Sequence, residues 1–421
     1  MTPADKTVID KTVADKTVAD KTDPHKTDAD SSADHSAAPA ALYGLGAPPR
    51  RVLIVLLGAI GDVVRALPLL GRLRRAWPKA HIAWAVEPKS QAVLEGHPGL
   101  DELMVYNRRV PLSFLPFLAR VRAGRFDLVL DLQRHLKSGV VSLASGARVR
   151  VGFDRSNGKE FNHLFSTRQI AAQPPMRLKL MQYQDFGDAL GVAPAPVEFG
   201  LVASEAERSR AAALLEGAPR PLLAVILGSS WPSRIYFPDS IAAVIREMAI
   251  AREGSPALFP VLIGSGRDEA ALADRVAAEL AGAPPSLNLA GRTNLRDLVA
   301  IFAECAAAFG PDSGPMHIAA AVGCPVVSLW GATAPERSAP WGYADLALHG
   351  AIPCHPCYLR ECPIGRECMR RIAPGDVAAA LRRAVAGPRP SLELPDGRSG
   401  PLPPASEEQR AIQIARLRQE R

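Results

Sequence analysis

One stretch in the second half of the chain combines residue types that bind anions. It reads Gly310-Pro311-Asp312-Ser313-Gly314-Pro315-Met316-His317-Ile318-Ala319-Ala320-Ala321. Asp312 or Ser313 can cap a helix that begins here, and the free N–H groups and positive dipole end of that helix would attract a phosphate. Gly314 lets a ligand approach the backbone, and His317, one turn into the helix, adds a donor. The alternative is a capped core helix whose histidine is satisfied internally.

A carboxylate near the start of the folded chain is the second candidate. Asp62 follows an apolar strand expected over 52–57 and a turn that contains Gly61, and a helix is expected over 63–76. Facing a cleft, this carboxylate would be a general base. At a helix N-terminus it would only interact favourably with the positive end of the helix dipole. The turn matches neither the G-x-G-x-x-G dinucleotide pattern nor a P-loop, which counts against an oxidoreductase or a P-loop NTPase.

Polar loops follow other predicted strands. Asp131 ends a strand expected over 127–131, and Lys137 belongs to the polar segment that follows it. These residues could line the rim of a ligand site, and the alternative is an ordinary capped helix start.

The second half of the chain has two more such loops. Ser229, Ser230 and Arg234 follow a strand and could bind phosphate oxygens, since arginine offers a bidentate fork. Asp268 or Glu269 follows the next strand and could accept the hydroxyls of a ribose. The alternative for both loops is ordinary solvated turn chemistry.

Four cysteines cluster near the carboxyl end. Cys354, Cys357, Cys362 and Cys368 give the spacing C-x2-C-x4-C-x5-C, which resembles a metal or iron–sulfur spacing. Reduced thiols in a compact loop, or a redox pair, are the alternatives that this spacing leaves open.

Composition favours an anionic partner. The 421 residues carry a formal net charge of +7, and the first 40 residues hold eight Asp and five Lys, so the remainder carries +10. This balance suits phosphates or an acidic membrane surface. We expect no nucleic-acid partner, because aromatic and basic residues are not interleaved. We also expect no signal peptide and no transmembrane helix, and therefore a cytoplasmic protein.

Strands that alternate with helices predict two doubly wound parallel sheets, with ligands beyond the carboxyl ends of the strands. The expected strands are 52–57, 81–86, 103–106, 127–131, 149–152, 222–227, 260–263, 287–289, 306–309 and 326–330. The expected helices are 63–76, 112–122, 137–144, 179–190, 240–252, 270–280 and 295–305, the last capped by Asn294. Gly310 and Pro311 are expected to stop the strand before them.

The chain is expected to divide into four parts. These are a disordered tail over 1–49 that contains a five-residue repeat, a Rossmann-like domain over 50–205, a second Rossmann-like domain over 206–385, and an extension over 386–421 with one amphipathic helix.

The motifs, taken in order, resemble glycosyltransferase family 9, the ADP-heptose:lipopolysaccharide heptosyltransferases. They are Gly61-Asp62-Val63 with Leu67-Pro68, the segment 127–138, Gly228-Ser229-Ser230 with Trp231 and Arg234, Ile263-Gly264-Ser265, Asn288-Leu289-Ala290-Gly291, and Asp312-Ser313-Gly314-Pro315-Met316-His317. The resemblance implies a GT-B fold, with an acceptor domain over 50–205 and a nucleotide-sugar donor domain over 206–385. It also implies an inverting transfer from a nucleotide-diphospho-sugar, with no metal or other cofactor required.

The resemblance also implies roles for single residues. Asp62 corresponds to the catalytic base. The donor contacts correspond to Ser229, Ser230, Arg234, Asp268 or Glu269, Asp312, Ser313, Gly314 and His317. The candidates on the acceptor side are Gly61, Asp131 and Lys137.

The expected substrates are an ADP-sugar donor and a lipid-linked anionic saccharide acceptor at the inner membrane surface. Two alternatives stay open. One is a related transferase that uses another nucleotide sugar or acceptor, and the other is a nucleotide-sugar-binding protein without turnover.

Overall fold

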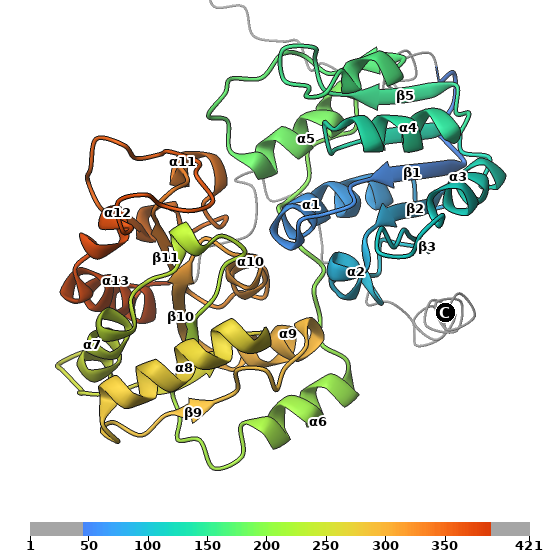
Figure 1. Ribbon diagram of the computed structural model, residues 1–421. Helices are drawn as coiled ribbons and strands as arrows, with labels where there is room; N and C mark the ends of the chain where they lie inside the picture. Colours follow the sequence, from blue (N-terminus) through green and yellow to red (C-terminus); the bar gives the residue numbers. More distant parts are fainter. Residues whose placement is uncertain (1–44, 389–421) are drawn as a thin grey trace, which may run out of the picture. The chain divides into compact units, whose positions relative to one another are not determined.

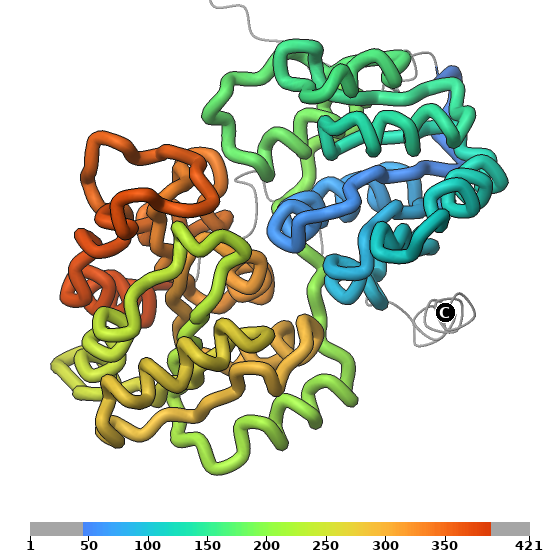
Figure 2. Tube along the Cα trace, in the orientation of Figure 1, coloured from blue at the N-terminus to red at the C-terminus, as the bar shows by residue number. Residues whose placement is uncertain are grey.

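Two parallel sheets of six strands each organise the part of the chain that the computed structural model describes, residues 45–388 (Figure 1). These residues lie in one compact unit. In Figure 2 the blue-to-green half of this chain forms the first sheet, and the yellow-to-red half forms the second. The predicted α/β class with two doubly wound sheets is therefore confirmed. The repeat tail and the final amphipathic helix lie outside the described residues.

The first sheet has the strand order β3-β2-β1-β4-β5-β6. Its strands are β1 (Arg51–Val55), β2 (His81–Val86), β3 (Glu102–Val105), β4 (Leu128–Asp131), β5 (Val149–Gly152) and β6 (Arg168–Gln169). Its helices are α1 (Ile60–Ala76), α2 (Pro88–Leu94), α3 (Phe114–Ala123), α4 (Leu136–Ala144), the 3₁₀ helix η2 (Asn162–Phe165) and α5 (Lys179–Ala189).

The second sheet has the order β12-β11-β10-β7-β8-β9. Its strands are β7 (Leu222–Ile226), β8 (Phe259–Ile263), β9 (Leu287–Asn288), β10 (Cys305–Pro311), β11 (Val326–Trp330) and β12 (Ala347–His349). The remaining helices are α6 (Glu205–Leu214), η3 (Pro232–Arg234), α7 (Pro238–Met248), α8 (Gly266–Leu280), α9 (Leu295–Ala303), α10 (Gly314–Ala321), α11 (Pro335–Ser338), η4 (Ala344–Leu346), α12 (Glu367–Arg370) and α13 (Pro374–Ala386).

Strand β1 shows why the first sheet needs helices on both faces. It is apolar at every position after Arg51, and alternate side chains of a strand point to opposite faces. Val52 and Ile54 join the core that includes α1 and α5, whereas Leu53 and Val55 join a separate core with α3 and α4. Helices α3 and α4 therefore cover one face of the sheet, and α1 and α5 cover the other.

Strand β10 is longer than the sequence predicted. Gly310 and Pro311 do not stop it, because both lie inside the strand and pair with Ser328 and Leu329 of β11. A Cβ atom on Gly310 would lie 2.4 Å from the backbone oxygen of Ile226, so this glycine lets β7 and β10 approach. The predicted strand break was therefore wrong. Glycine and proline are common in turns, but here the glycine is required by the close packing of two strands.

Several boundaries also differ from the prediction. Helix α1 begins at Ile60, three residues early, so Asp62 lies in its first turn. Helix α9 ends at Ala303, and Cys305 belongs to β10 rather than to the helix. Helices α2, α6 and α13 were not predicted. The pair Ser204 and Glu207 forms a capping box at the start of α6, which is a signal that the sequence carries.

The expected cap at Asn294 is confirmed and gives a test of helix stability. Its side chain accepts hydrogen bonds from the N–H groups of Arg296 and Asp297. Asn294→Ala should lower the free energy of unfolding in urea by about 1 kcal/mol. Ser313→Ala is the control, because Ser313 occupies the N-cap of α10 without a capping bond from its side chain. An equal loss in both variants would contradict the assignment.

Candidate functional site

Two cavities lie at the carboxyl ends of the strands. The loop cavity, of about 480 Å³, is bounded by the loops after β7 and β8 and by the first residues of α9, α10, α1 and α2. The polar cavity, of about 770 Å³, is bounded by the loops after β1, β2 and β4 and reaches Trp231 and Arg360. Ala59, Lys89 and Ser230 line both cavities. Both cavities therefore lie where the sequence predicts a ligand site, beyond the strand ends.

Glu269, rather than Asp268, is the carboxylate of the loop cavity. Glu269 lines the cavity and accepts a hydrogen bond from the N–H of Ser265, whereas Asp268 is exposed and is not among the lining residues. A Cβ atom on Gly228 would lie 1.7 Å from a carboxylate oxygen of Glu269, and one on Gly264 would lie 2.8 Å from its Cβ atom. Both glycines therefore make room for Glu269. Burial raises the pKa of Glu269 above its ordinary value.

Asp312 organises the loop before α10 and does not cap the helix. Its carboxylate accepts from Arg234, with 3.0 Å between the charged atoms, and from the hydroxyl of Thr333 at 2.8 Å. Its carbonyl oxygen accepts from the hydroxyl of Ser229 at 2.8 Å. The expected capping by Asp312 or Ser313 was wrong, because the Asp312 carboxylate is held by these partners. The hydroxyl of Ser313 is buried without a hydrogen-bond partner among the described residues.

Asp62 lies between two cations. Its carboxylate oxygen is 2.6 Å from the ammonium of Lys179 on α5 and 2.7 Å from the guanidinium of Arg65, one turn along α1. Burial opposes ionisation, but these two cations outweigh it and hold the pKa of Asp62 well below its usual range. Burial lowers the pKa of Lys179 to about 8, although Asp62 opposes the shift. Asp62 is therefore a carboxylate at neutral pH.

Arg65 also connects α1 with α10. Its guanidinium lies 2.6 Å from Nε2 of His317, and a Cβ atom on Gly61 would lie 2.8 Å from Cδ2 of the same ring. Burial, and then the charge of Arg65, lower the pKa of His317 well below its ordinary value. The ring is therefore neutral, and its Nε2 accepts the hydrogen bond from Arg65. His317 contacts this cation and is not among the residues that line either cavity.

The polar cavity carries Asp62 in its wall together with basic side chains. These are Lys89, Arg108, His135, Lys137 and Arg360, and the other carboxylates are Glu87 and Glu160. Lys137 lies over the ring of Tyr106, 5.4 Å from its centroid. Glu87 lies 3.6 Å from Arg108 and 3.9 Å from Lys137 and offsets part of their charge. The lysines and arginines of this wall still outnumber its carboxylates, so the cavity would suit a substrate that carries negative charge.

Asp131 does not reach either cavity. Its carboxylate is 1% exposed and accepts from the side-chain amide of Asn162 at 2.8 Å and from the N–H of Gln133 at 3.1 Å. Burial raises its pKa. The residue fastens the loop after β4 to η2, so the structure does not support the expectation that it faces an acceptor.

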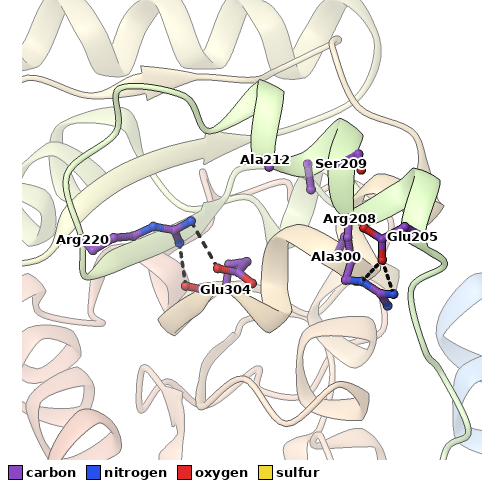
Figure 3. Close-up of a pocket in the computed structure, with 8 residues that line it drawn as sticks. Glu205, Arg208, Ser209, Ala212, Arg220, Ala300 and Glu304 are labelled. Atoms are coloured by element: carbon purple, nitrogen blue, oxygen red, sulfur yellow. Dashed lines mark hydrogen bonds and ion pairs between the residues drawn. The ribbon is translucent and has the colours of Figure 1, made fainter.

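A third hollow, between α6 and α9, has a structural explanation (Figure 3). Arg220 pairs with the carboxylate of Glu304 at 3.2 Å, and Arg208 pairs with Glu205 at 2.7 Å. The polar side chains that surround this hollow thus neutralise one another. It contains none of the residues predicted to bind a ligand.

The cysteine cluster is not arranged as a metal site. Over residues 45–388, no group of three or more His, Cys, Asp or Glu side chains could hold a metal ion. The four thiols differ in environment, since Cys354 is exposed, Cys357 and Cys362 are half-buried, and Cys368 is buried.

The structure brings only some of the predicted site residues together around the two cavities. Gly61, Ser229, Ser230, Ser313 and Gly314 line the loop cavity. Asp62, Lys137 and Ser230 line the polar cavity. Three further predicted residues line neither cavity, namely Arg234, Asp312 and His317. They stabilise the surrounding loops and helices through the Arg234–Asp312 ion pair and the contact of His317 with Arg65.

Two cations beside Asp62 were not predicted. Arg65 stands three residues after Asp62, a spacing that puts both side chains on one helix face, so the sequence held a signal for this pair. Lys179 is 117 residues away from Asp62, and no local pattern indicates their contact.

The chain is similar to known proteins in both sequence and fold. A family model described as "Glycosyltransferase family 9 (heptosyltransferase)" matches residues 115–367. The chain is 26% identical over 302 residues to the lipopolysaccharide core heptosyltransferase OpsX of Haemophilus influenzae, covering 70% of this chain and 83% of that protein. It is 28% identical over 369 residues to lipopolysaccharide heptosyltransferase 1 of Pseudomonas aeruginosa, covering 80% and 99%.

A solved structure confirms the fold class. The glycosyl transferase family 9 protein from Veillonella parvula superposes with a TM-score of 0.64 at 20% sequence identity, covering 80% of this chain and 97% of that one. The predicted GT-B fold, with two Rossmann-like sheets, is therefore confirmed.

The ion pair between Asp62 and Lys179 can be tested by titration. Lys179→Met removes the nearer cation, so the pKa of Asp62 should rise and its carboxylate should take up a proton at higher pH. ¹³C NMR of protein labelled in its aspartate carboxyls measures this pKa, and Asp62→Asn assigns the signal. Lys159→Met, at an exposed position, is the control. An unchanged Asp62 titration in Lys179→Met would show that the two groups do not interact in solution.

Proposed function

Because this chain belongs to glycosyltransferase family 9 (heptosyltransferase), we propose that it transfers a heptose from ADP-heptose to a hydroxyl of the lipopolysaccharide inner core, with inversion at the anomeric carbon. The curated relatives reported above bear the names of lipopolysaccharide heptosyltransferases. One observation carries the proposal: Asp62 lines the polar cavity, and the adjacent Gly61 lines the loop cavity. A base at that junction can serve a donor on one side and an acceptor on the other.

The loop cavity suits a nucleoside diphosphate. Ser229, Ser230 and the start of α10 at Ser313 and Gly314 offer hydroxyl and backbone donors to the phosphates. Glu269 lines the same cavity beside Gly228 and would accept the hydroxyls of the ribose. In this proposal Arg234 supports the phosphate loop through its ion pair with Asp312.

The proposed reaction is one displacement at the anomeric carbon. The acceptor oxygen forms the new glycosidic bond as the bond from that carbon to the diphosphate breaks, and Asp62 takes the proton of the acceptor hydroxyl. The developing charge on the leaving diphosphate is met by hydroxyls and N–H groups that are already in place. This chemistry requires no metal ion or other cofactor.

The polar cavity suits an anionic saccharide acceptor. Lys89, Arg108 and Lys137 contribute positive charge to its wall. We therefore propose that residues 50–205 form the acceptor domain and 206–385 the donor domain, and that the enzyme works at the cytoplasmic side of the inner membrane. No helix within residues 45–388 is long and apolar enough to cross a bilayer.

Binding of the donor tests the assignment of the loop cavity. Isothermal calorimetry should show that ADP and ADP-heptose bind more tightly than the UDP and GDP forms. Glu269→Gln should weaken ADP binding by about tenfold or more, because it removes a charged hydrogen-bond acceptor. Asp268→Asn is the matched control and should leave the affinity unchanged. Equal losses in both variants would reject the ribose assignment, and a preference for UDP or GDP would change the donor.

The role of Asp62 is tested by transfer. Asp62→Asn should retain ADP-heptose binding and lose about 10²–10⁴-fold in the rate of heptose transfer, since the proton acceptor is removed. The rate is measured under saturating donor with inner-core acceptor. Full transfer activity in this variant would remove Asp62 from the mechanism, and absent turnover in the unmodified protein would support a binding protein instead.

A further inference from the structure

Large apolar side chains are exposed on the first sheet in an unusual concentration. Six of them define what we call the apolar face: Leu112 (87% exposed), Leu115 (71%), Leu136 (47%), Leu143 (50%), Phe161 (74%) and Leu164 (71%). Leu115 lies on α3 and Leu112 just before it, and Leu136 and Leu143 lie on α4. Leu164 lies on η2, and Phe161 directly precedes that helix. Exposed large apolar side chains in this number on neighbouring elements are typical of an interaction site.

These side chains share one side of the molecule. Helices α3 and α4 lie side by side over the same face of the sheet (Figure 1). Leu136 and Leu143 stand seven residues apart on α4, which places them on one stripe of that helix. Segment η2 is fastened to the start of α4, because the side-chain amide of Asn162 donates to the carbonyl of His135 at 2.9 Å.

The same region is strongly basic. Residues 107–168 contain twelve Lys and Arg and four Asp and Glu, a formal net charge of +8 that exceeds the +7 of the whole chain. All four acids are engaged: Asp127 accepts from the backbone of Arg50, Asp131 is buried, Asp154 accepts from Ser156, and Glu160 accepts from the backbone of Leu136. Exposed apolar side chains on a segment with this excess of positive charge suit an anionic lipid surface, where the apolar groups enter the acyl boundary and cations meet the headgroups.

The apolar face adjoins the mouth of the polar cavity. Leu136 lies between His135 and Lys137, and Phe161 follows Glu160; the three polar residues line that cavity. We propose that the apolar face docks on an anionic phospholipid bilayer and brings the polar cavity to the headgroup level. This inference rests on the proposed function, because a lipid-linked acceptor held in the bilayer would then reach Asp62 without leaving it.

Vesicle sedimentation of the full chain tests the docking directly. The protein should bind vesicles of phosphatidylglycerol and phosphatidylcholine, bind vesicles of phosphatidylcholine alone far more weakly, and lose affinity as salt is added. The double variant Leu115→Ser/Phe161→Ser should weaken binding to the anionic vesicles by about tenfold or more, since two apolar groups no longer leave water. Val202→Ser/Ile250→Ser is the matched control, because both side chains are exposed elsewhere, and it should bind as the unmodified protein does.

Further readouts separate this inference from the proposed function. With a delipidated, water-soluble core saccharide the double variant should transfer heptose at the unmodified rate, whereas transfer to acceptor in vesicles should fall with vesicle affinity. Vesicle binding itself needs no turnover and therefore stands even if ADP-heptose is not the donor. Equal vesicle binding by both double variants would overturn the proposal. So would a change of oligomeric state in Leu115→Ser/Phe161→Ser by light scattering with vesicle binding retained, because the face would then be a protein contact.

Discussion

The interaction on which the site depends is the ion pair of Asp62 with Lys179 and Arg65. A largely buried carboxylate is costly unless cations and hydrogen bonds compensate its charge, and removing one partner leaves the other uncompensated. Here the two partners come from α5 and from α1, and Arg65 extends the network to His317 on α10. The charge of Asp62 thus connects α1 with α5 directly and with α10 through Arg65, and it links the first sheet to the helix whose start bounds the proposed donor site.

This network requires close approach of the backbones around it, and small residues provide it. Gly61 leaves room for the ring of His317, and a Cβ atom on Gly314 would lie 2.8 Å from the Cβ of Ile60. The starts of α1 and α10 therefore come together only because both positions lack a side chain. Gly228 and Gly264 do the same for Glu269. In each case the glycine makes room for a neighbouring side chain: His317 beside Gly61, Ile60 beside Gly314, and Glu269 beside Gly228 and Gly264.

The alternation of strands and helices, and the loops that follow the strands, were predictable because periodicity and breaker residues are local signals. Asp62, Ser230 and Gly314 were found for that reason. Lys179 and the burial of Asp131 were not, because they depend on which distant segments pack together. Gly310 and Pro311 led to a wrong prediction of a strand end. Residues that usually break a strand are tolerated here, because the neighbouring strand must approach Gly310 closely. Sequence reasoning thus located the loops, whereas the roles of single side chains within them depended on tertiary contacts.

The two cations beside Asp62 bear on how it could act as a base. A carboxylate whose pKa is held well below its usual range is a poor proton acceptor, and general-base catalysis is most effective when the pKa lies near the working pH. In the proposed reaction the diphosphate of the donor would bring negative charge to the other side of Gly61. A cation that turned toward that charge would leave Asp62 and raise its basicity. Arg65 contacts both Asp62 and His317, so it connects the proposed base with α10, the helix whose first residues bound the loop cavity.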